Sequence, residues 1–83
     1  MTYIASPFEF QDNDSRDKWL QKFRDSMNDI CIKYKVPHLL DQIKLDIADG
    51  KVGIISMGAS VGGSGEERAT REILKVYNDS FWN

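Results

Sequence analysis

The fold class of this chain depends on the stretch VGIISM at residues 52–57. It is rich in β-branched residues and too short for a helix, so it predicts one short strand. The only other strand-like segment is TYIASPFEF at residues 2–10, where Pro7 allows an edge strand at most. If the two segments pair, the fold is α+β, mainly helical; if they do not, it is an all-α three-helix domain.

The longest predicted element is an amphipathic helix over residues 15–35. Asp14 or Ser15 has a side chain suited to its N-terminal cap. Apolar residues then recur at three- and four-residue spacing, which places them on one face of a helix. These residues are Trp19, Phe23, Met27, Ile30, Cys31 and Tyr34.

Two further helices are predicted by the same reasoning. Residues 37–49 have apolar positions at helical spacing, and Gly50 follows at a position where helices commonly end. The last helix is expected over residues 64–80, because Ser64 and Glu67 have the spacing of a capping box.

Length and charge limit the chain to a small acidic protein. Its 83 residues suffice for one core, so we expect a single domain over residues 1–83, with residues 1–13 as an extended arm. The net charge of −2 is spread over helical faces of mixed sign, which predicts no basic patch and no nucleic-acid partner. Its lone cysteine, and a sequence without a signal-like or membrane-length apolar run, predict a cytoplasmic protein with no membrane partner.

Large aromatic side chains stand near both ends of the chain. Because so small a core leaves the fold short of burial, such rings either pack back on the body or bind a partner. We predict partner-binding anchors at Phe8, Phe10, Phe81 and Trp82. The function that follows is a non-enzymatic regulator or inhibitor, of the type that phages and mobile elements encode, docking on a larger host or cognate protein. Self-association into a homo-oligomer is another route to the missing burial.

A glycine-rich loop at residues 58–65 follows the predicted strand and opens the last helix. In this context backbone N–H groups and the helix dipole bind phosphates. The candidate ligand-binding residues are Gly62, Gly63, Ser64, Gly65 and Arg68. The alternative function is therefore a binder of a phosphorylated small ligand or nucleotide, against which Glu66 and Glu67 place two negative charges at the same helix end.

The residue pattern predicts neither an enzyme nor a metal or cofactor site. His38 is the only histidine, and Asp41 three residues later is its one nearby carboxylate, without a nucleophile for the pair to activate. Cys31 lies on the apolar face of the first helix, which predicts a small buried residue. We therefore expect no catalytic residues and no metal ligands.

Two other segments are IKLDIAD at residues 43–49 and MGASVGGSGEERA at residues 57–69, and together they delimit about a third of the chain. They resemble the aspartate loop and the Gly-rich strand-to-helix turn of FtsZ, the bacterial tubulin-like division GTPase. In that family the aspartate loop of one subunit completes the GTP site of the next, and the resemblance implies Asp46 and Asp49 as its counterparts. The family's nucleotide-binding domain has no counterpart in these residues, so the implied function is a mimic that acts on the division machinery.

Overall fold

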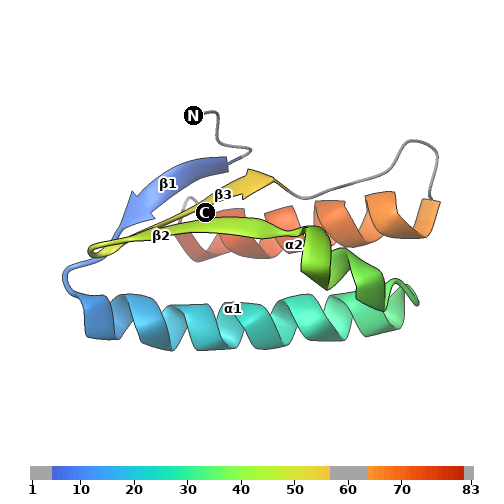
Figure 1. Ribbon diagram of the computed structural model, residues 1–83, viewed down its shortest axis with the longest axis horizontal. Coiled ribbons are helices and arrows are strands. Elements are labelled where there is room, and N and C mark those ends of the chain that lie inside the picture. The colour runs from blue at the N-terminus through green and yellow to red at the C-terminus, as the bar shows by residue number, and fades with distance from the viewer. Residues whose placement is uncertain (1–4, 57–63, 82–83) are drawn as a thin grey trace.

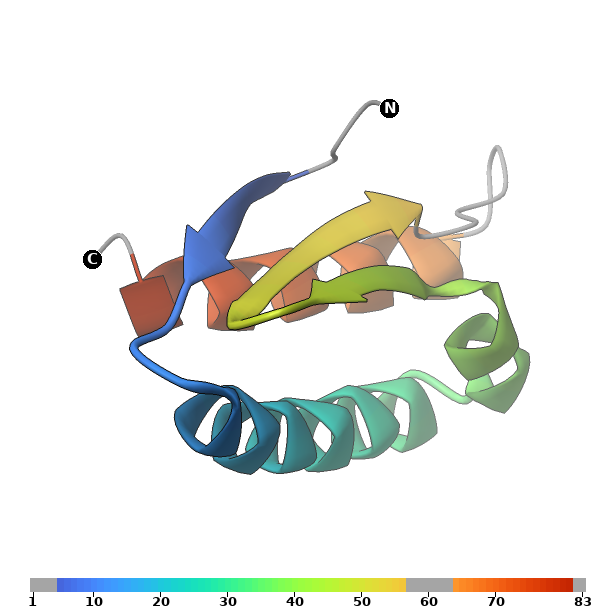
Figure 2. The same ribbon diagram turned by 60° about the vertical axis from the view of Figure 1, so that its left-hand side comes forward.

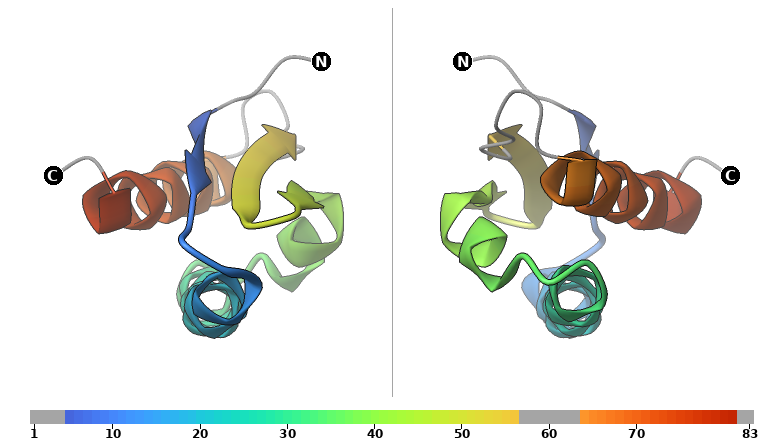
Figure 3. Two further views of the ribbon diagram at one scale, coloured as in Figure 1. Left: turned by 90° about the vertical axis from the view of Figure 1, so that its left-hand side faces the viewer. Right: turned by 90° about the vertical axis from the view of Figure 1, so that its right-hand side faces the viewer.

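The computed structural model describes residues 5–56 and 64–81, which form a sheet with helices packed on one of its faces (Figure 1). In chain order the elements are β1 (Ala5–Glu9), α1 (Asn13–Lys33), the 3₁₀ helix η1 (Pro37–Gln42), β2 (Lys44–Ala48), β3 (Lys51–Ser56) and α2 (Ser64–Phe81). The two α-helices run in opposite directions alongside each other (Figure 2). Seen along the helices, α1 lies beneath the sheet and α2 lies beside β1 (Figure 3).

The sheet is antiparallel, with the strand order β1-β3-β2. In the central strand, Val52 pairs with Phe8 of β1 on one side and with Ile47 of β2 on the other. The pairing of the N-terminal arm with the short strand, which sequence reasoning left open, is therefore present. Val52 and Ile54 alternate with residues of the opposite face, and both are 0 % exposed beneath the helices.

The predicted helix at residues 37–49 is wrong, and so are both fold descriptions built on three helices and at most one paired strand. Only its first part is helical, as η1, and the rest forms β2 and the turn to β3. The apolar residues of this segment fit both the helical period and the strand period, since Ile43, Leu45 and Ile47 also stand at every second position, as in a strand. Pairing with β3 satisfies the backbone of both strands, and Asp49 and Gly50 make a two-residue turn between them.

The helix α1 begins two residues before its predicted start. Its N-cap is Asp12, in place of the predicted Asp14 or Ser15. The Asp12 carboxylate accepts a hydrogen bond from the backbone N–H of Ser15 at 2.7 Å, and this bond lowers the pKa of Asp12. An acidic cap also interacts favourably with the positive end of the helix dipole.

The C-terminal end of α1 is closed by a left-handed residue, Lys35, with φ 58°. The Val36 N–H donates to the carbonyl oxygen of Cys31 at 2.8 Å, and the Lys35 N–H donates to that of Ile32 at 3.0 Å. This pair of bonds is a Schellman motif, in which the left-handed residue, here Lys35, is usually a glycine. The motif turns the chain sharply into η1 and buries Val36.

The helix α2 confirms the prediction for residues 64–80 to within one residue. With α1 it encloses the core against β3. The buried core residues are Leu20, Phe23, Met27, Ile30, Cys31, Val36, Leu39, Val52, Ile54, Ala69, Ile73 and Tyr77.

Candidate functional site

The aromatic side chains predicted as partner anchors meet at one end of the molecule. Phe8 and Phe81 stack with their ring centroids 4.0 Å apart, and Phe10 packs edge-on against Phe81 at 5.5 Å. Trp19 of α1 completes the cluster, with its ring centroid 4.7 Å from that of Phe81. Segments from β1, α1 and the end of α2 thus converge, while Trp82 lies outside the described residues.

The inner side of this cluster belongs to the core. Trp19 packs on Phe23 at 4.6 Å and on Tyr77 at 5.7 Å, and both of these rings are buried. The outer side is partly exposed and lines a hollow of about 410 Å³, whose rim includes Ser15 and Ser80. We call this feature the aromatic hollow. The rings therefore close the fold and also present an apolar surface to solvent.

Trp19 is not among the anchors that the sequence predicts. Its spacing along α1 matches that of the core residue Phe23, so periodicity alone places it in the apolar stripe. What distinguishes it is its position one turn and a half into α1, next to the end of β1, and this proximity exists only in the folded chain. The sequence thus predicts three rings of the aromatic hollow, whereas the fourth, Trp19, joins them only through the tertiary structure.

The predicted ligand-binding segment is only partly within the structure. Gly62, Gly63 and the side chain of Ser64 lie outside the described residues. Gly65 lies in the first turn of α2 and faces α1, because a Cβ placed there would come within 3.3 Å of the Tyr34 carbonyl oxygen. Gly65 therefore permits the close approach of α2 to the end of α1, which is a packing role.

The two carboxylates of the first α2 turn are held by basic side chains. Glu66 Oε1 lies 2.9 Å from His38 Nε2, so η1 is tied to α2 by this pair. Glu67 accepts a hydrogen bond from Arg71 at 2.5 Å, one turn further along the helix. The histidine that sequence reasoning set beside Asp41 is thus paired across the fold with Glu66.

Arg68 lies in a cleft between α1 and α2 that we call the basic cleft. The cleft has a volume of about 350 Å³ and is lined by Lys33, Tyr34, Arg68, Arg71, Glu72 and Lys75. Four cationic side chains surround one carboxylate, in a chain whose net charge is −2. Each helix alone has mixed charges, and only the packing of α1 on α2 brings these cations together, two of them in ion pairs with Glu72 and Glu67.

The carboxylate of the basic cleft is already engaged. The Tyr34 hydroxyl donates a hydrogen bond to the Glu72 carboxylate and lowers its pKa. Lys33 Nζ lies 3.3 Å from Glu72 Oε1, and this hydrogen bond raises the pKa of Lys33. In the part of the chain that the structure describes, Arg68 and Lys75 take part in no ion pair. The charge of Lys75 still acts on Glu72, whose pKa it helps to lower.

The remaining candidates are Cys31 and the two aspartates of the FtsZ resemblance. Cys31 is 0 % exposed, and burial raises the pKa of its thiol, so the prediction of a small core residue is confirmed. Asp46 lies in β2, and Asp49 in the following turn accepts a hydrogen bond from the Asn13 amide at 2.8 Å. The FtsZ resemblance stays a prediction, and co-sedimentation with polymerising FtsZ that depends on both aspartates is its test.

Over residues 5–56 and 64–81, no three His, Cys, Asp or Glu side chains are placed to hold a metal ion. None of the helices within those ranges has the length and apolar character needed to cross a membrane. A scan against protein-family models finds no match for this chain. Searches of the curated proteins and of the solved structures likewise find no similar chain.

Proposed function

We propose that this protein is a non-enzymatic regulator or inhibitor that docks on a larger protein through the aromatic hollow. The observation that carries the proposal is that four partly exposed rings, from three elements, line one apolar hollow. These rings are Phe8, Phe10, Trp19 and Phe81. Aromatic side chains dominate the binding energy of protein interfaces, and those already held by neighbouring rings lose little freedom on binding.

The test must separate docking from folding, because the rings of the hollow also pack against the core. Ser80 lies on the rim of the hollow and is exposed, so Ser80→Arg fills the hollow without removing a ring contact. Asn78 is exposed two residues earlier on α2 and does not line the hollow, so Asn78→Arg is the matched control. Both variants introduce the same charged side chain near the end of α2, so they differ only in whether it enters the hollow.

We expect affinity capture from the native host to recover the same partner with the wild type and with Asn78→Arg. Recovery with Ser80→Arg should fall by about tenfold or more, at an unchanged melting temperature, since blocking a central pocket costs about 1.4 kcal/mol or more. Equal recovery with all three proteins contradicts docking through the aromatic hollow.

A second candidate function, binding of a phosphorylated small ligand, is favoured by the basic cleft. Arg68 is one of the candidate ligand-binding residues of the sequence, and it lies with Lys75 and Arg71 around one cleft. Arginine binds phosphate oxygens through paired N–H donors, and several cations at one cleft favour a ligand with more than one negative charge. The site so proposed is the helix face, because Gly65 and the two following glutamates are used in packing and ion pairs.

Titration calorimetry with pyrophosphate and with ATP tests this second candidate. We expect saturable binding that weakens as salt is raised, and that is lost in Arg68→Gln and in Lys75→Gln. Lys22→Gln, on the exposed face of α1, removes the same charge elsewhere and should bind like the wild type. If millimolar pyrophosphate and ATP both give no saturable heat, the basic cleft is not a phosphate site.

A further inference from the structure

The two edges of the sheet differ in how they meet solvent. β1 contains Pro7 and a register irregularity between Ala5 and Phe8, and both features interrupt a ladder and protect an edge. β2 contains no proline, its register with β3 shifts only between Lys44 and Leu45, and among the described residues it pairs only with β3. An antiparallel strand directs every second N–H and C=O away from its partner, so β2 has backbone groups at an unpaired edge.

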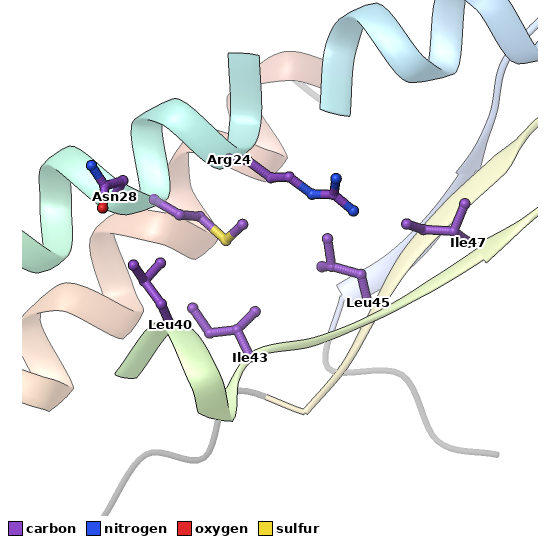
Figure 4. Close-up of a pocket in the computed structure, with 7 residues that line it drawn as sticks. Arg24, Asn28, Leu40, Ile43, Leu45 and Ile47 are labelled. Atoms are coloured by element: carbon purple, nitrogen blue, oxygen red, sulfur yellow. The ribbon is translucent and has the colours of Figure 1, made fainter. Parts of the chain in front are cut away.

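An apolar groove runs beside this edge, between α1 and β2. Its volume is about 400 Å³, and its lining is Arg24, Met27 and Asn28 of α1 with Leu40, Ile43, Leu45 and Ile47 (Figure 4). Ile47 is 41 % exposed, so this side of the groove presents apolar surface to solvent. A strand added at the β2 edge would extend the sheet over the open side of the groove.

We propose that β2 pairs with β2 of a second copy of this chain, across a two-fold axis perpendicular to the sheet. This axis keeps the helices of both copies on one face of a continuous antiparallel sheet. With Leu45 opposite Leu45 of the second copy, Ile43 lies opposite Ile47, and Lys44 lies opposite Asp46. Ile43 precedes β2 and already has an extended backbone, with φ −85° and ψ 119°. The two apolar grooves then meet as one core between the two α1 helices.

Charge favours this register over its neighbour. Lys44 and Asp46 alternate with the apolar residues of the groove, so both lie on the opposite face of the sheet, and the axis creates the Lys44–Asp46 pair twice. In the next register that keeps the helices on one face, the two-fold axis passes through Asp46 instead of Leu45. Asp46 then lies directly opposite Asp46 of the second copy. Like charges directly opposite destabilise a strand pair. β2 is therefore complementary to itself in charge and in apolar pattern, which identifies a second copy as its occupant.

Sedimentation velocity over a concentration series tests the proposal with the full chain. We expect a dimer whose dissociation constant rises by about tenfold or more in Lys44→Asp and in Asp46→Lys, because each places two like-charge pairs across the axis. The double variant Lys44→Asp/Asp46→Lys restores both pairs and should recover the wild-type constant. Lys22→Asp on the exposed face of α1 is the matched control and should leave the constant unchanged.

Hydrogen exchange provides a second measurement on the wild type alone. The backbone N–H groups of β2 that point away from β3 should gain protection as concentration rises, whereas those of β1 should not. A wild type that stays monomeric throughout the series overturns the proposal. A dimer that both single variants leave intact overturns the β2 edge as its interface, and failure of the double variant to recover overturns the register.

Discussion

The hydroxyl of Tyr77 in α2 donates a hydrogen bond to the carbonyl oxygen of Ser6 in β1, at 2.7 Å and across 71 positions of sequence. The carbonyl oxygen of Val52 in β3 lies 3.2 Å from the same hydroxyl. Tyr77 is 0 % exposed, so this polar contact lies inside the core. It ties the last helix to the edge strand and to the central strand at once.

Removing this hydroxyl should destabilise the protein. Tyr77→Phe keeps the ring contacts but leaves the carbonyl of Ser6 without its side-chain donor, so the free energy of unfolding should fall by about 1 kcal/mol. Urea denaturation measures the change. Tyr34→Phe removes a hydroxyl that bonds to the surface carboxylate of Glu72, and its effect should be smaller. Equal losses in the two variants would argue against a special role for the buried bond.

The same hydroxyl predicts a loss of stability at alkaline pH. Burial raises the pKa of Tyr77 to about 12 from an ordinary 10.0. The unfolded chain therefore releases this proton at a lower pH than the folded chain does. The stabilisation is complete below about pH 10 and is lost as pH rises toward 12, with a slope of up to about 1.4 kcal/mol per pH unit. Urea unfolding over this range should show that contribution in the wild type and not in Tyr77→Phe.

Lys35 offers a position at which a glycine should stabilise the protein. Its φ of 58° costs a lysine about 1 kcal/mol relative to glycine, because the side chain crowds its own backbone in this region. Lys35→Gly should therefore raise the free energy of unfolding by about that amount. Lys22→Gly, in the interior of α1, should lower it by a similar amount. A fall in stability in both variants would show that the Lys35 side chain has a role of its own.

Gly50 is expected to respond in the opposite way. Its φ is 69°, its N–H donates to the Asn13 side chain at 2.6 Å, and its carbonyl oxygen accepts from the Phe10 N–H at 2.6 Å. Gly50→Ala should lower the free energy of unfolding by about 1–2 kcal/mol, as thermal and urea unfolding would measure. Gly50→Asn should cost less, because asparagine tolerates this backbone conformation better. A larger loss for asparagine than for alanine would contradict a conformational cause.

Phe81 should contribute to stability as well as to the aromatic hollow. Its ring contacts those of Phe8, Phe10, Trp19 and Tyr77, and Phe81→Ala removes all four contacts. We expect the free energy of unfolding to fall by about 2–4 kcal/mol, as for truncation of a large aromatic side chain that packs against the core. Ile32 is 62 % exposed, so Ile32→Ala should change it by about 0.5 kcal/mol or less. Similar small changes in both would place Phe81 outside the packed structure.

The two α-helices could be predicted from the sequence because their signals are local. The apolar spacing of α1 extends over 21 residues and that of α2 over 18, long enough for one period to be clear. The segment 43–49 could not be assigned in this way, since its apolar residues satisfy the helical and the strand period together. Asp49 followed by Gly50, between alternating residues, is a hairpin signal that favours the strand. Gly50 also suits a helix end, so this signal alone does not separate the two structures.

The candidate sites also combine residues with a local sequence signal and residues that only tertiary contacts bring together. Phe8, Phe10 and Phe81 were recognisable as rings too large to leave in water, yet their partner Trp19 became part of a site only when α1 met β1. The basic cleft had no local signal, because Lys33 and Arg68 lie on separate helices and Arg68 directly follows two glutamates. Long-range packing decided both.

By itself the sequence determined the residues that must be buried and the two long helices that bury them, because hydrophobic periodicity acts between near neighbours. Only the tertiary structure decided that β3 gains a partner on each side, that residues 44–48 form a strand, and that β2 has β3 as its one partner strand among the described residues. The physical reason is that the backbone hydrogen bonds of a strand are satisfied by other segments. A strand therefore depends on contacts that no local pattern contains.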